Sequence, residues 1–372
     1  METKIQMIKE LTRALNDQPT TLFFTITSRC NAFCDFCWNW KNVADAGKFS
    51  KPGQPIKRPE LSLEEISQMT KQLSSMLTVN LFGGEPFLRE DIFEIISLFV
   101  KNSDTKYISI PTNGSWPDKI KEVIGRAVKE FPDTFFKIYL SLDGPEAEHN
   151  RIRKLKDGYN RLISSMNYLH ELKSEHKNVS VSCNINFNAQ TQHYMRSFVH
   201  EVMSWNKFDS ISLDLVRGND LYDKELLKTD TQLYNELESE IKNYRPISSQ
   251  PFSPLHKAIE QKTNEVILKS IQNPERRVFN CFAGKKIILL NDIGEVMACE
   301  HLLDRKMGNI RNFNYSIYRL LQSTEAKEIR KDIVDKKCNC RWDCAINNSN
   351  IVQLTKYPDL ILKSVKNMTS NL

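Results

Sequence analysis

The sequence predicts an α/β protein whose main part is a partial barrel of six strand–helix units, followed by a small α+β domain. Six apolar runs of strand length alternate with segments whose apolar residues recur at helical spacing. This alternation favours a parallel sheet covered by helices. A length of 372 residues suffices for a large domain and a smaller one. The predicted strands cover residues 21–27, 77–82, 106–110, 136–142, 179–187 and 210–216.

Composition and the N-terminal segment indicate a reducing, cytoplasmic setting. The apolar residues of the first 17 positions repeat at helical spacing, which predicts a helix within residues 1–20 rather than a signal peptide. Most of the nine cysteines fall in two tight groups, which favours metal binding over disulfides. The longest mainly apolar stretch, residues 92–100, is too short to span a bilayer. A net charge of +6 without a concentrated basic face argues against a nucleic-acid enzyme.

The first strand leads directly into Cys30, Cys34 and Cys37, spaced as CxxxCxxC. Three thiolates can hold three irons of a [4Fe-4S] cube, whose usual ligation is four cysteines, so one iron would stay open to a small molecule. A zinc knuckle is the alternative, but structural zinc takes four ligands, and this loop offers no fourth Cys or His. Residues 38–61 follow as a long loop whose Trp38 and Trp40 either shield the cluster or belong to a substrate lid.

The next two strands also end in unusual residues. Ser62 and Glu65 form a capping box that begins the helix before the second strand. That strand ends in Gly-Gly-Glu-Pro at residues 83–86, where glycines let the backbone approach a ligand and the carboxylate can accept from an ammonium group. The third strand ends in Thr-Asn-Gly at 112–114, which alone predicts a turn. Pro117 then opens a helix over 119–131.

In the last three strands, apolar and polar residues alternate. The apolar set should pack on the helices and the polar set should line the lumen of the barrel. A polar lumen is a binding chamber rather than a packed core, and Cys183 falls on the helix-facing side as a structural thiol. The residues predicted to face the lumen are Lys137, Tyr139, Ser141, Asp143, Ser182, Asn184, Asn186, Ser212 and Asp214.

The three cysteines together with the Gly-Gly-Glu-Pro stretch at the next strand end resemble the motifs of the radical S-adenosylmethionine (SAM) superfamily. The resemblance implies a radical SAM type of barrel and a cluster whose open iron is chelated by SAM. It further implies that an arginine of the segment after strand four pairs with the SAM carboxylate, Arg153 by position and Arg151 as the second choice. The cofactor-binding positions it implies are Phe36, Gly83, Gly84, Glu85, Asn113, Ser141, Asp143, Arg153, Asn188 and Leu215.

A helical linker is predicted over 219–280, broken by prolines, and a second cysteine group follows in 281–372. Residues 286–299 look like a hairpin with a turn at 292–294. A cysteine before such a hairpin resembles the opening of SPASM and twitch domains, which implies one auxiliary [4Fe-4S] cluster. Either Cys338 or Cys340 is then spare, and a structural zinc site is the alternative. The predicted auxiliary ligands are Cys281, Cys299, Cys338, Cys340 and Cys344.

The resemblance implies that the first cluster cleaves SAM reductively, and that the resulting radical takes hydrogen from a small molecule such as a sugar, polyol or natural-product intermediate. A peptide-modifying enzyme is the alternative, and an iron-sulfur electron carrier or zinc-binding module is the alternative of another class. An external reductant such as flavodoxin or ferredoxin is expected as a partner. Asp214 and Tyr139, with Asn184 and Asn186, are candidates for substrate contact or proton transfer on their lumen positions alone.

Overall fold

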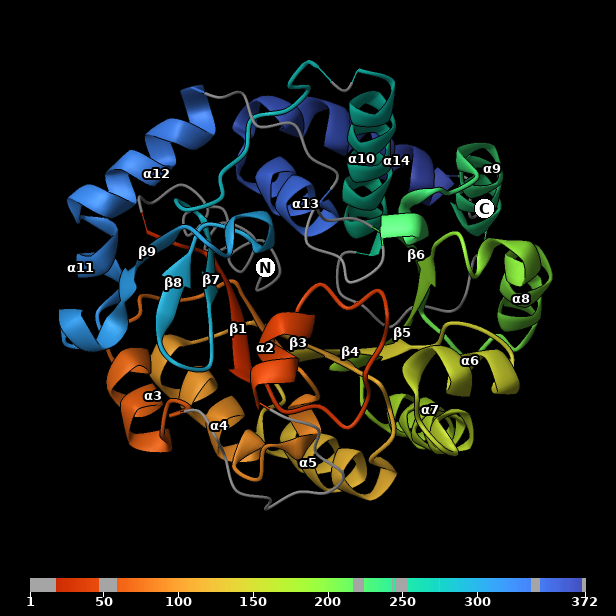
Figure 1. Cartoon of the computed structure of the whole chain (residues 1–372), viewed down its shortest axis with the longest axis horizontal. Helices are drawn as coiled ribbons and strands as arrows, with labels where there is room; N and C mark the ends of the chain where they lie inside the picture. Colours follow the sequence, from red (N-terminus) through yellow and green to blue (C-terminus); the bar gives the residue numbers. More distant parts are fainter. Residues whose placement is uncertain are drawn as a thin grey trace.

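The structure is a computed structural model, and it describes residues 18–46, 59–216, 224–242, 244, 253–273, 275–335 and 342–369. The predicted N-terminal helix lies outside the described residues except for its last three positions, which are not helical. Figure 1 shows a strongly curved sheet with helices along its outer side and further helices across its concave side.

All six predicted strands are present, each within two residues of its predicted ends. They run parallel, and each pairs with the next in chain order, so the α/β class and the partial barrel are confirmed. The sheet does not close, because β6 forms one of its edges. The strands are β1 (Thr21–Thr27), β2 (Thr78–Gly83), β3 (Tyr107–Thr112), β4 (Phe135–Ser141), β5 (Val179–Phe187) and β6 (Ser210–Leu215).

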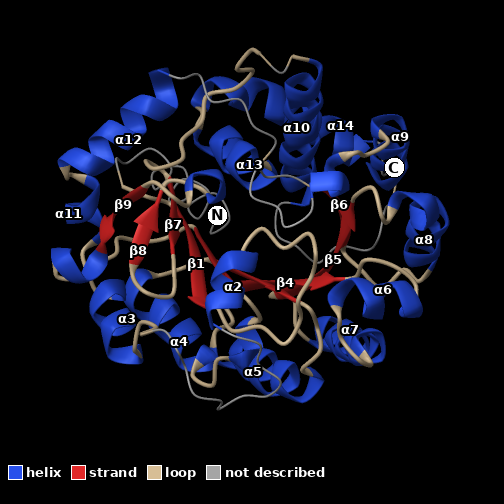
Figure 2. Cartoon of the chain, viewed as in Figure 1, coloured by secondary structure: helices blue, strands red, loops and turns tan. Residues whose placement is uncertain are grey.

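The helices between these strands cover the convex side of the sheet (Figure 2). Their apolar faces and the helix-facing strand residues form one hydrophobic core, in which Val79, Phe99 and Ile124 are fully buried. Burial of this apolar area is the main stabilising contribution to the fold. The covering helices are α3 (Leu63–Thr70), α4 (Ile92–Ser103), α5 (Pro117–Glu130), α6 (Glu146–Arg153), α7 (Gly158–Glu175) and α8 (Gln192–Ser204).

Alternation along the strands follows the sequence prediction. In β4, Ile138 and Leu140 are fully buried against the helices, whereas Lys137 and Tyr139 line a cavity on the other side. Cys183 of β5 is fully buried in the core, as predicted for a structural thiol. The inner face of the sheet is therefore polar along β4 to β6.

The predicted hairpin forms, but it extends the barrel sheet. β7 (Ile287–Leu290) pairs in parallel with β1 through four residues, and β8 (Glu295–Met297) and β9 (Lys306–Asn309) continue outward as antiparallel strands. The sheet thus has nine strands in the order β6-β5-β4-β3-β2-β1-β7-β8-β9. The predicted division into domains at residues 218 and 281 stays a prediction, and the sheet runs across it.

The prediction that residues 38–61 form a loop was wrong in part. Residues 38–61 include the helix α2 (Trp40–Ala46), and residues 47–58 of the same segment lie outside the described residues. Within the described residues, five helices of ten residues or more follow β6. None of the described helices is long and apolar enough to cross a membrane. The remaining helices are η1 (Pro86–Leu88), η2 (Lys224–Leu227), α9 (Thr231–Lys242), α10 (Ser253–Gln272), η3 (Glu300–Leu302), η4 (Ile310–Phe313), α11 (Ile317–Leu321), α12 (Thr324–Asp335), α13 (Asp343–Val352), η5 (Leu354–Lys356) and α14 (Tyr357–Thr369).

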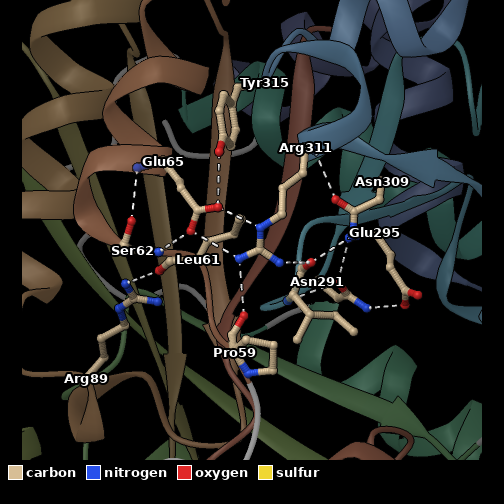
Figure 3. A network of polar contacts seen from close by, with 11 residues as sticks. Pro59, Leu61, Ser62, Glu65, Arg89, Asn291, Glu295, Asn309, Arg311 and Tyr315 are labelled. Carbon is tan, nitrogen blue, oxygen red and sulfur yellow. Dashed lines mark hydrogen bonds and ion pairs between the residues drawn. The ribbon is translucent and has the colours of Figure 1, made fainter.

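Arg311 joins the added strands to the barrel (Figure 3). Its guanidinium donates to both carboxylate oxygens of Glu65 at 2.6 and 3.1 Å and to the carbonyls of Ile293 and Pro59 at 2.9 and 3.2 Å. Glu65 also completes the predicted capping box with Ser62 at the start of α3. One side chain therefore caps a barrel helix and accepts the ion pair that anchors the C-terminal strands.

Replacing Glu65 with glutamine is expected to lower the free energy of unfolding by about 1 to 2 kcal/mol, because a bidentate charged contact becomes a single neutral one. The hydrogen bonds from Arg311 lower the pKa of Glu65 to about 2. The carboxylate's contribution is thus complete above pH 4.5 and is lost as the pH falls toward 2. Urea unfolding at several pH values in this window should show a smaller pH dependence in Glu65→Gln. Equal pH dependence in both proteins would contradict the prediction.

Candidate active site

Cys30, Cys34 and Cys37 lie around one cavity of about 270 Å³ at the C-terminal ends of the barrel strands. Cys30 is buried, and the other two are half-buried. Burial raises the pKa of all three thiols, that of Cys37 to about 12, and each thiol is disfavoured as a thiolate by at least one neighbouring thiol or carboxylate. A bound cation is what stabilises such thiolates, since metal coordination deprotonates a thiol.

Two glycines fix the cysteine loop against the end of β2. The amide of Gly84 donates to the carbonyl of Thr27 and the amide of Glu85 to that of Arg29, both at 2.8 Å. A Cβ on Gly83 would overlap the Thr27 carbonyl oxygen, and one on Gly84 would overlap that of Arg29 and stand 2.8 Å from the Cβ of Cys30. Only glycine permits this backbone approach, so the Gly-Gly pair positions the cysteines, and both glycines also line the cavity.

An amide network that the sequence analysis missed holds the same loop from the β3 side. The side chain of Asn113 donates to Asn31 at 2.9 Å, and Asn31 donates to the hydroxyl of Ser115 at 2.8 Å. All three residues are buried. Asn31 lies between the first two cysteines and Asn113 follows β3, so the Thr-Asn-Gly turn is tied to the cysteine loop. The spacing of three polar residues in two separate turns carries no signal in the sequence.

The sequence suggested that the carboxylate of Glu85 faces a ligand, but in the structure it bonds to neighbouring protein groups. It is fully buried, and it accepts from the Thr112 hydroxyl at 2.7 Å, the Asn113 amide at 2.8 Å and the Phe87 amide at 3.2 Å. Burial raises its pKa to about 7 despite these donors. The carboxylate therefore joins the segment after β2 to the end of β3, and it is not among the residues that line the cavity. Its contact with SAM stays a prediction.

Arg153 and Asp143 form a buried ion pair in the wall of the same cavity. The guanidinium donates to one Asp143 oxygen at 2.7 and 2.6 Å, while the other oxygen accepts from the amide of Asn186 at 2.8 Å. His149 accepts from the Asp143 amide at 3.3 Å, and burial lowers the pKa of this imidazole to about 3, so it is neutral. Both Arg153 and Asp143 line the cavity beside Cys34, and they are 8% and 1% exposed.

The other predicted SAM-binding residues divide into two sets. Phe36, Ser141 and Leu215 line the cavity, and the Phe36 ring centroid lies 5.8 Å from the Arg153 guanidinium. Asn188 is buried in a turn, where its side chain accepts from two backbone amides and donates to Asn186, and it does not line the cavity. Arg151 pairs with Glu148 at the surface, so the geometry favours Arg153 of the two arginines.

A second, larger cavity of about 470 Å³ fills the lumen beside the first. Both are lined by Trp38, Asn184 and Asp214, so the two spaces meet at these residues. Of the four residues predicted to contact substrate, Asp214 and Asn184 line both cavities, Tyr139 lines the larger one and Asn186 the smaller one. The structure therefore places all four in the walls of two adjoining cavities, and Asp214 and Asn184 at their junction.

The second cysteine group is only partly described. Cys344 at the start of α13 lines the larger cavity. Burial raises the pKa of Tyr139, which lines the same cavity, and the nearby Cys344 adds a small contribution in the same direction. Cys281 and Cys299 flank β7 and β8. Cys338 and Cys340 lie outside the described residues. Among the described residues, no three His, Cys, Asp or Glu side chains converge closely enough to hold a single metal ion.

The sequence model of the Radical SAM superfamily matches residues 24–198, from β1 into α8. These residues are a radical SAM domain. The chain thus contains a domain of that superfamily, whose members are enzymes, and the domain implies a [4Fe-4S] cluster and SAM. GTP 3′,8-cyclase of Klebsiella pneumoniae (strain 342) is 34% identical over 110 residues, which are 29% of this chain and 31% of that enzyme. The chain thus matches about a third of the length of this curated relative.

Two solved structures share the fold over most of the chain. One is anSMEcpe with bound AdoMet, with a TM-score of 0.57, 16% identity and coverage of 95% of this chain and 96% of that one. The other is SuiB of Streptococcus suis bound to S-adenosylmethionine, with a TM-score of 0.58, 15% identity and coverage of 91% and 76%. The similarity extends beyond the radical SAM domain into the C-terminal segment.

The residues of the smaller cavity fit the cluster that the radical SAM domain implies. The predicted ligands are three thiols and include no carboxylate. Thiolates bind the iron of iron-sulfur clusters, whereas cations such as Mg²⁺ and Ca²⁺ prefer carboxylate oxygens. Gly83 and Gly84 present backbone to the same space, where any side chain would collide with the cysteine loop. A buried cation, Arg153, lines the same cavity and can bind an anionic ligand group.

Proposed function

We propose that this radical SAM enzyme cleaves SAM and uses the product radical to take a hydrogen atom from a substrate held in the larger cavity. The observation that supports this most is that one cavity combines Cys30, Cys34 and Cys37 with the Gly83–Gly84 backbone and the cation of Arg153. A [4Fe-4S] cluster held by the three cysteines would supply the electron that splits SAM into methionine and a 5′-deoxyadenosyl radical.

The residues of the smaller cavity bind and orient SAM in this proposal. Arg153 attracts the SAM carboxylate, and Asp143 keeps the guanidinium in place and charged: burial alone would lower the pKa of Arg153, but Asp143 raises it. Phe36 offers an aromatic face for the adenine.

The substrate lies in the lumen, with its reacting carbon at the junction of the cavities. Asn184 and Asp214 border both spaces and are placed to contact it there. A volume of about 470 Å³ suits a molecule of sugar or small natural-product size. We therefore favour a small-molecule substrate. We also propose that an auxiliary cluster, held by Cys344 and other cysteines of the predicted auxiliary set, assists the oxidation of this substrate.

A peptide substrate is the second candidate, and one observation favours it. SuiB has been solved bound to its precursor peptide SuiA, and this structure shares the fold with a TM-score of 0.52 over 81% of this chain and 64% of that one. At 16% identity the similarity concerns the fold alone. That this chain also acts on a peptide is therefore a hypothesis. A peptide side chain entering the same lumen would meet the same polar residues.

Anaerobic reconstitution with iron and sulfide, followed by dithionite and SAM, tests the proposal. We expect iron bound to the three N-terminal cysteines and formation of 5′-deoxyadenosine. About four irons per chain would indicate the first cluster alone, and about eight would support the auxiliary cluster. Deuterium transfer from a labelled candidate substrate into 5′-deoxyadenosine would establish hydrogen abstraction. A reconstituted protein that holds zinc and forms no 5′-deoxyadenosine would overturn the proposal.

Replacing Arg153 with lysine is expected to weaken SAM binding about tenfold, because an ammonium cannot keep both contacts with Asp143 and also reach the SAM carboxylate with the same orientation. Equilibrium dialysis with labelled SAM measures this. Arg151→Lys is the matched control, since Arg151 makes its ion pair at the surface. Equal weakening in both variants would contradict the assignment of Arg153.

A further inference from the structure

Every polar atom of Asp143 bonds to a neighbouring residue. Its carboxylate accepts from the guanidinium of Arg153 and from the backbone amide of Asn186. Its own amide donates to Nδ1 of His149 at 3.3 Å, and its carbonyl accepts from the hydroxyl of Tyr194 at 2.8 Å. The peptide groups on both sides of the Asp143 Cα are therefore held, and the direction of the carboxylate is fixed with them.

His149 is fully buried and lines neither cavity. It stands one turn of α6 before Arg153, so the two side chains lie on the same face of this helix. The neutral imidazole accepts at Nδ1 and therefore carries its proton at Nε2, a buried atom without a hydrogen-bond partner. An unpaired buried donor costs free energy, so packing alone would favour an apolar side chain here. What the histidine offers instead is the acceptor for Asp143.

The contact from Tyr194 of α8 depends on the glycine that follows Asp143. A Cβ on Gly144 would stand 2.9 Å from the Tyr194 hydroxyl oxygen, so the hydroxyl would have to move away from the Asp143 carbonyl. The Asp-Gly pair after β4 thus lets α8 hold the end of this strand, while α6 holds it through His149.

The same helix α6 also contacts the cysteine loop. The amide of Phe33 donates to the backbone carbonyl of Arg153 at 3.2 Å, and the ammonium of Lys154 lies 2.5 Å from a carboxylate oxygen of Asp35. Phe33 and Asp35 flank Cys34 in the chain. The backbone of Arg153 is therefore held by the cysteine loop and its guanidinium by Asp143, so its direction in the smaller cavity depends on both.

We propose that His149 and Tyr194 are positioning residues for SAM, because they hold Asp143 so that its carboxylate directs the Arg153 guanidinium toward the SAM carboxylate. This rests on the proposed function and adds the groups that orient its binding site for the anion. Neither residue lines the smaller cavity, so both act through Asp143 and Arg153. A guanidinium binds a carboxylate well only in a matching orientation. The effect should therefore appear in the part of the SAM affinity that the carboxylate supplies.

Comparing SAM with decarboxylated SAM, which lacks this carboxylate and keeps the amino group, sulfonium and adenosine, measures that part. Equilibrium dialysis uses the enzyme reconstituted with iron and sulfide, without reductant. We expect the unaltered enzyme to bind SAM at least about tenfold more tightly than decarboxylated SAM, the size of a charge-assisted contact. His149→Leu should weaken SAM binding about tenfold and change binding of decarboxylated SAM less than about twofold, so that the preference for SAM is lost.

Three further variants test the route of this effect. His149→Asn should keep the preference, because the asparagine Oδ1 can accept from the same amide. Tyr194→Phe keeps the ring and should lower the preference about threefold through loss of one neutral hydrogen bond. His170→Leu is the matched control, since this ring contacts the Lys207 carbonyl at 3.2 Å and lines neither cavity, and it should leave both affinities unchanged. Iron analysis and thermal melting show that each variant is loaded and folded.

A preference for SAM that is lost in His149→Leu and restored in His149→Asn supports the inference. The inference is overturned if His149→Leu keeps the preference, or if it weakens both ligands equally, as a purely structural role would. It is also overturned if His149→Leu weakens SAM binding as much in an Arg153→Lys background as alone, because residues that act through one contact are not additive.

The proposed function has a separate readout. Formation of 5′-deoxyadenosine by the unaltered enzyme after addition of dithionite tests SAM cleavage. Its absence, with the SAM preference present and lost in His149→Leu, would count against the radical reaction and support the positioning role. Equal binding of SAM and decarboxylated SAM by the unaltered enzyme would overturn the assignment of Arg153 to the SAM carboxylate, and the inference with it.

Discussion

Replacing Cys34 with alanine is expected to abolish formation of 5′-deoxyadenosine, a loss of at least about 10³-fold, because two cysteines cannot keep a cluster that needs three. The iron content of the reconstituted variant should fall together with the visible absorption of the cluster. The protein should remain folded, since Cys34 is half-buried and packs in a small cluster apart from the main core.

Cys183→Ala is the matched control for this variant. It also replaces a cysteine with alanine, but Cys183 is a fully buried thiol of β5 on the helix-facing side of the sheet. We expect it to lose about 1 kcal/mol of stability through a small cavity and to keep its iron and its SAM cleavage. Cys34→Ala protein with full iron and unchanged 5′-deoxyadenosine formation would refute the assignment of the cysteine loop.

Replacing Gly84 with alanine should cost about 2 to 3 kcal/mol of stability and remove most bound iron, because the new methyl group overlaps the Arg29 carbonyl and crowds Cys30. Relief of this collision displaces the backbone that carries the first cysteine. Urea unfolding gives the stability change, and iron analysis after reconstitution gives the effect on the site.

Gly125→Ala serves as the control for Gly84→Ala. There the added methyl group meets the end of the Tyr168 side chain, which can rotate away, and the position lies within helix α5. Alanine in a helix interior gains about 1 kcal/mol over glycine. We therefore expect a protein of equal or higher stability with normal iron content. A Gly84→Ala protein that behaves like Gly125→Ala would show that the glycine is not needed for the cysteine loop.

The sequence predicted what local patterns encode. Strand alternation located the polar lumen, and the two glycines and three cysteines at consecutive strand ends located the smaller cavity, because parallel strands bring their carboxyl ends to one edge. The capping box of Ser62 and Glu65 was also confirmed. These features depend on residues near one another in the chain, or on a rule that holds for every barrel of this kind.

Contacts between distant segments were not predictable. Nothing in the residues around 287–290 indicates that they pair with β1, about 265 residues earlier, rather than with their own neighbours. The ion pair between Glu65 and Arg311 and the hydrogen bond between Asn31 and Asn113 also join segments that are far apart in the sequence. Asn188 was placed at the cavity by position along its strand, whereas an Asx-type turn holds its side chain. A polar residue at a strand end can serve the turn or the ligand, and the sequence alone does not separate these roles.

The pairing of β7 with β1 bears on how this protein can be divided for experiments. β1 is an interior strand because β7 covers its outer edge, and the cysteine loop begins directly after it. A fragment ending near residue 280 would expose the backbone groups of β1 as a free edge, and exposed edges of this kind promote aggregation. The radical SAM domain alone is thus a poor unit for expression. Changes made in the C-terminal segment should also be checked for their effect on the iron of the first cluster.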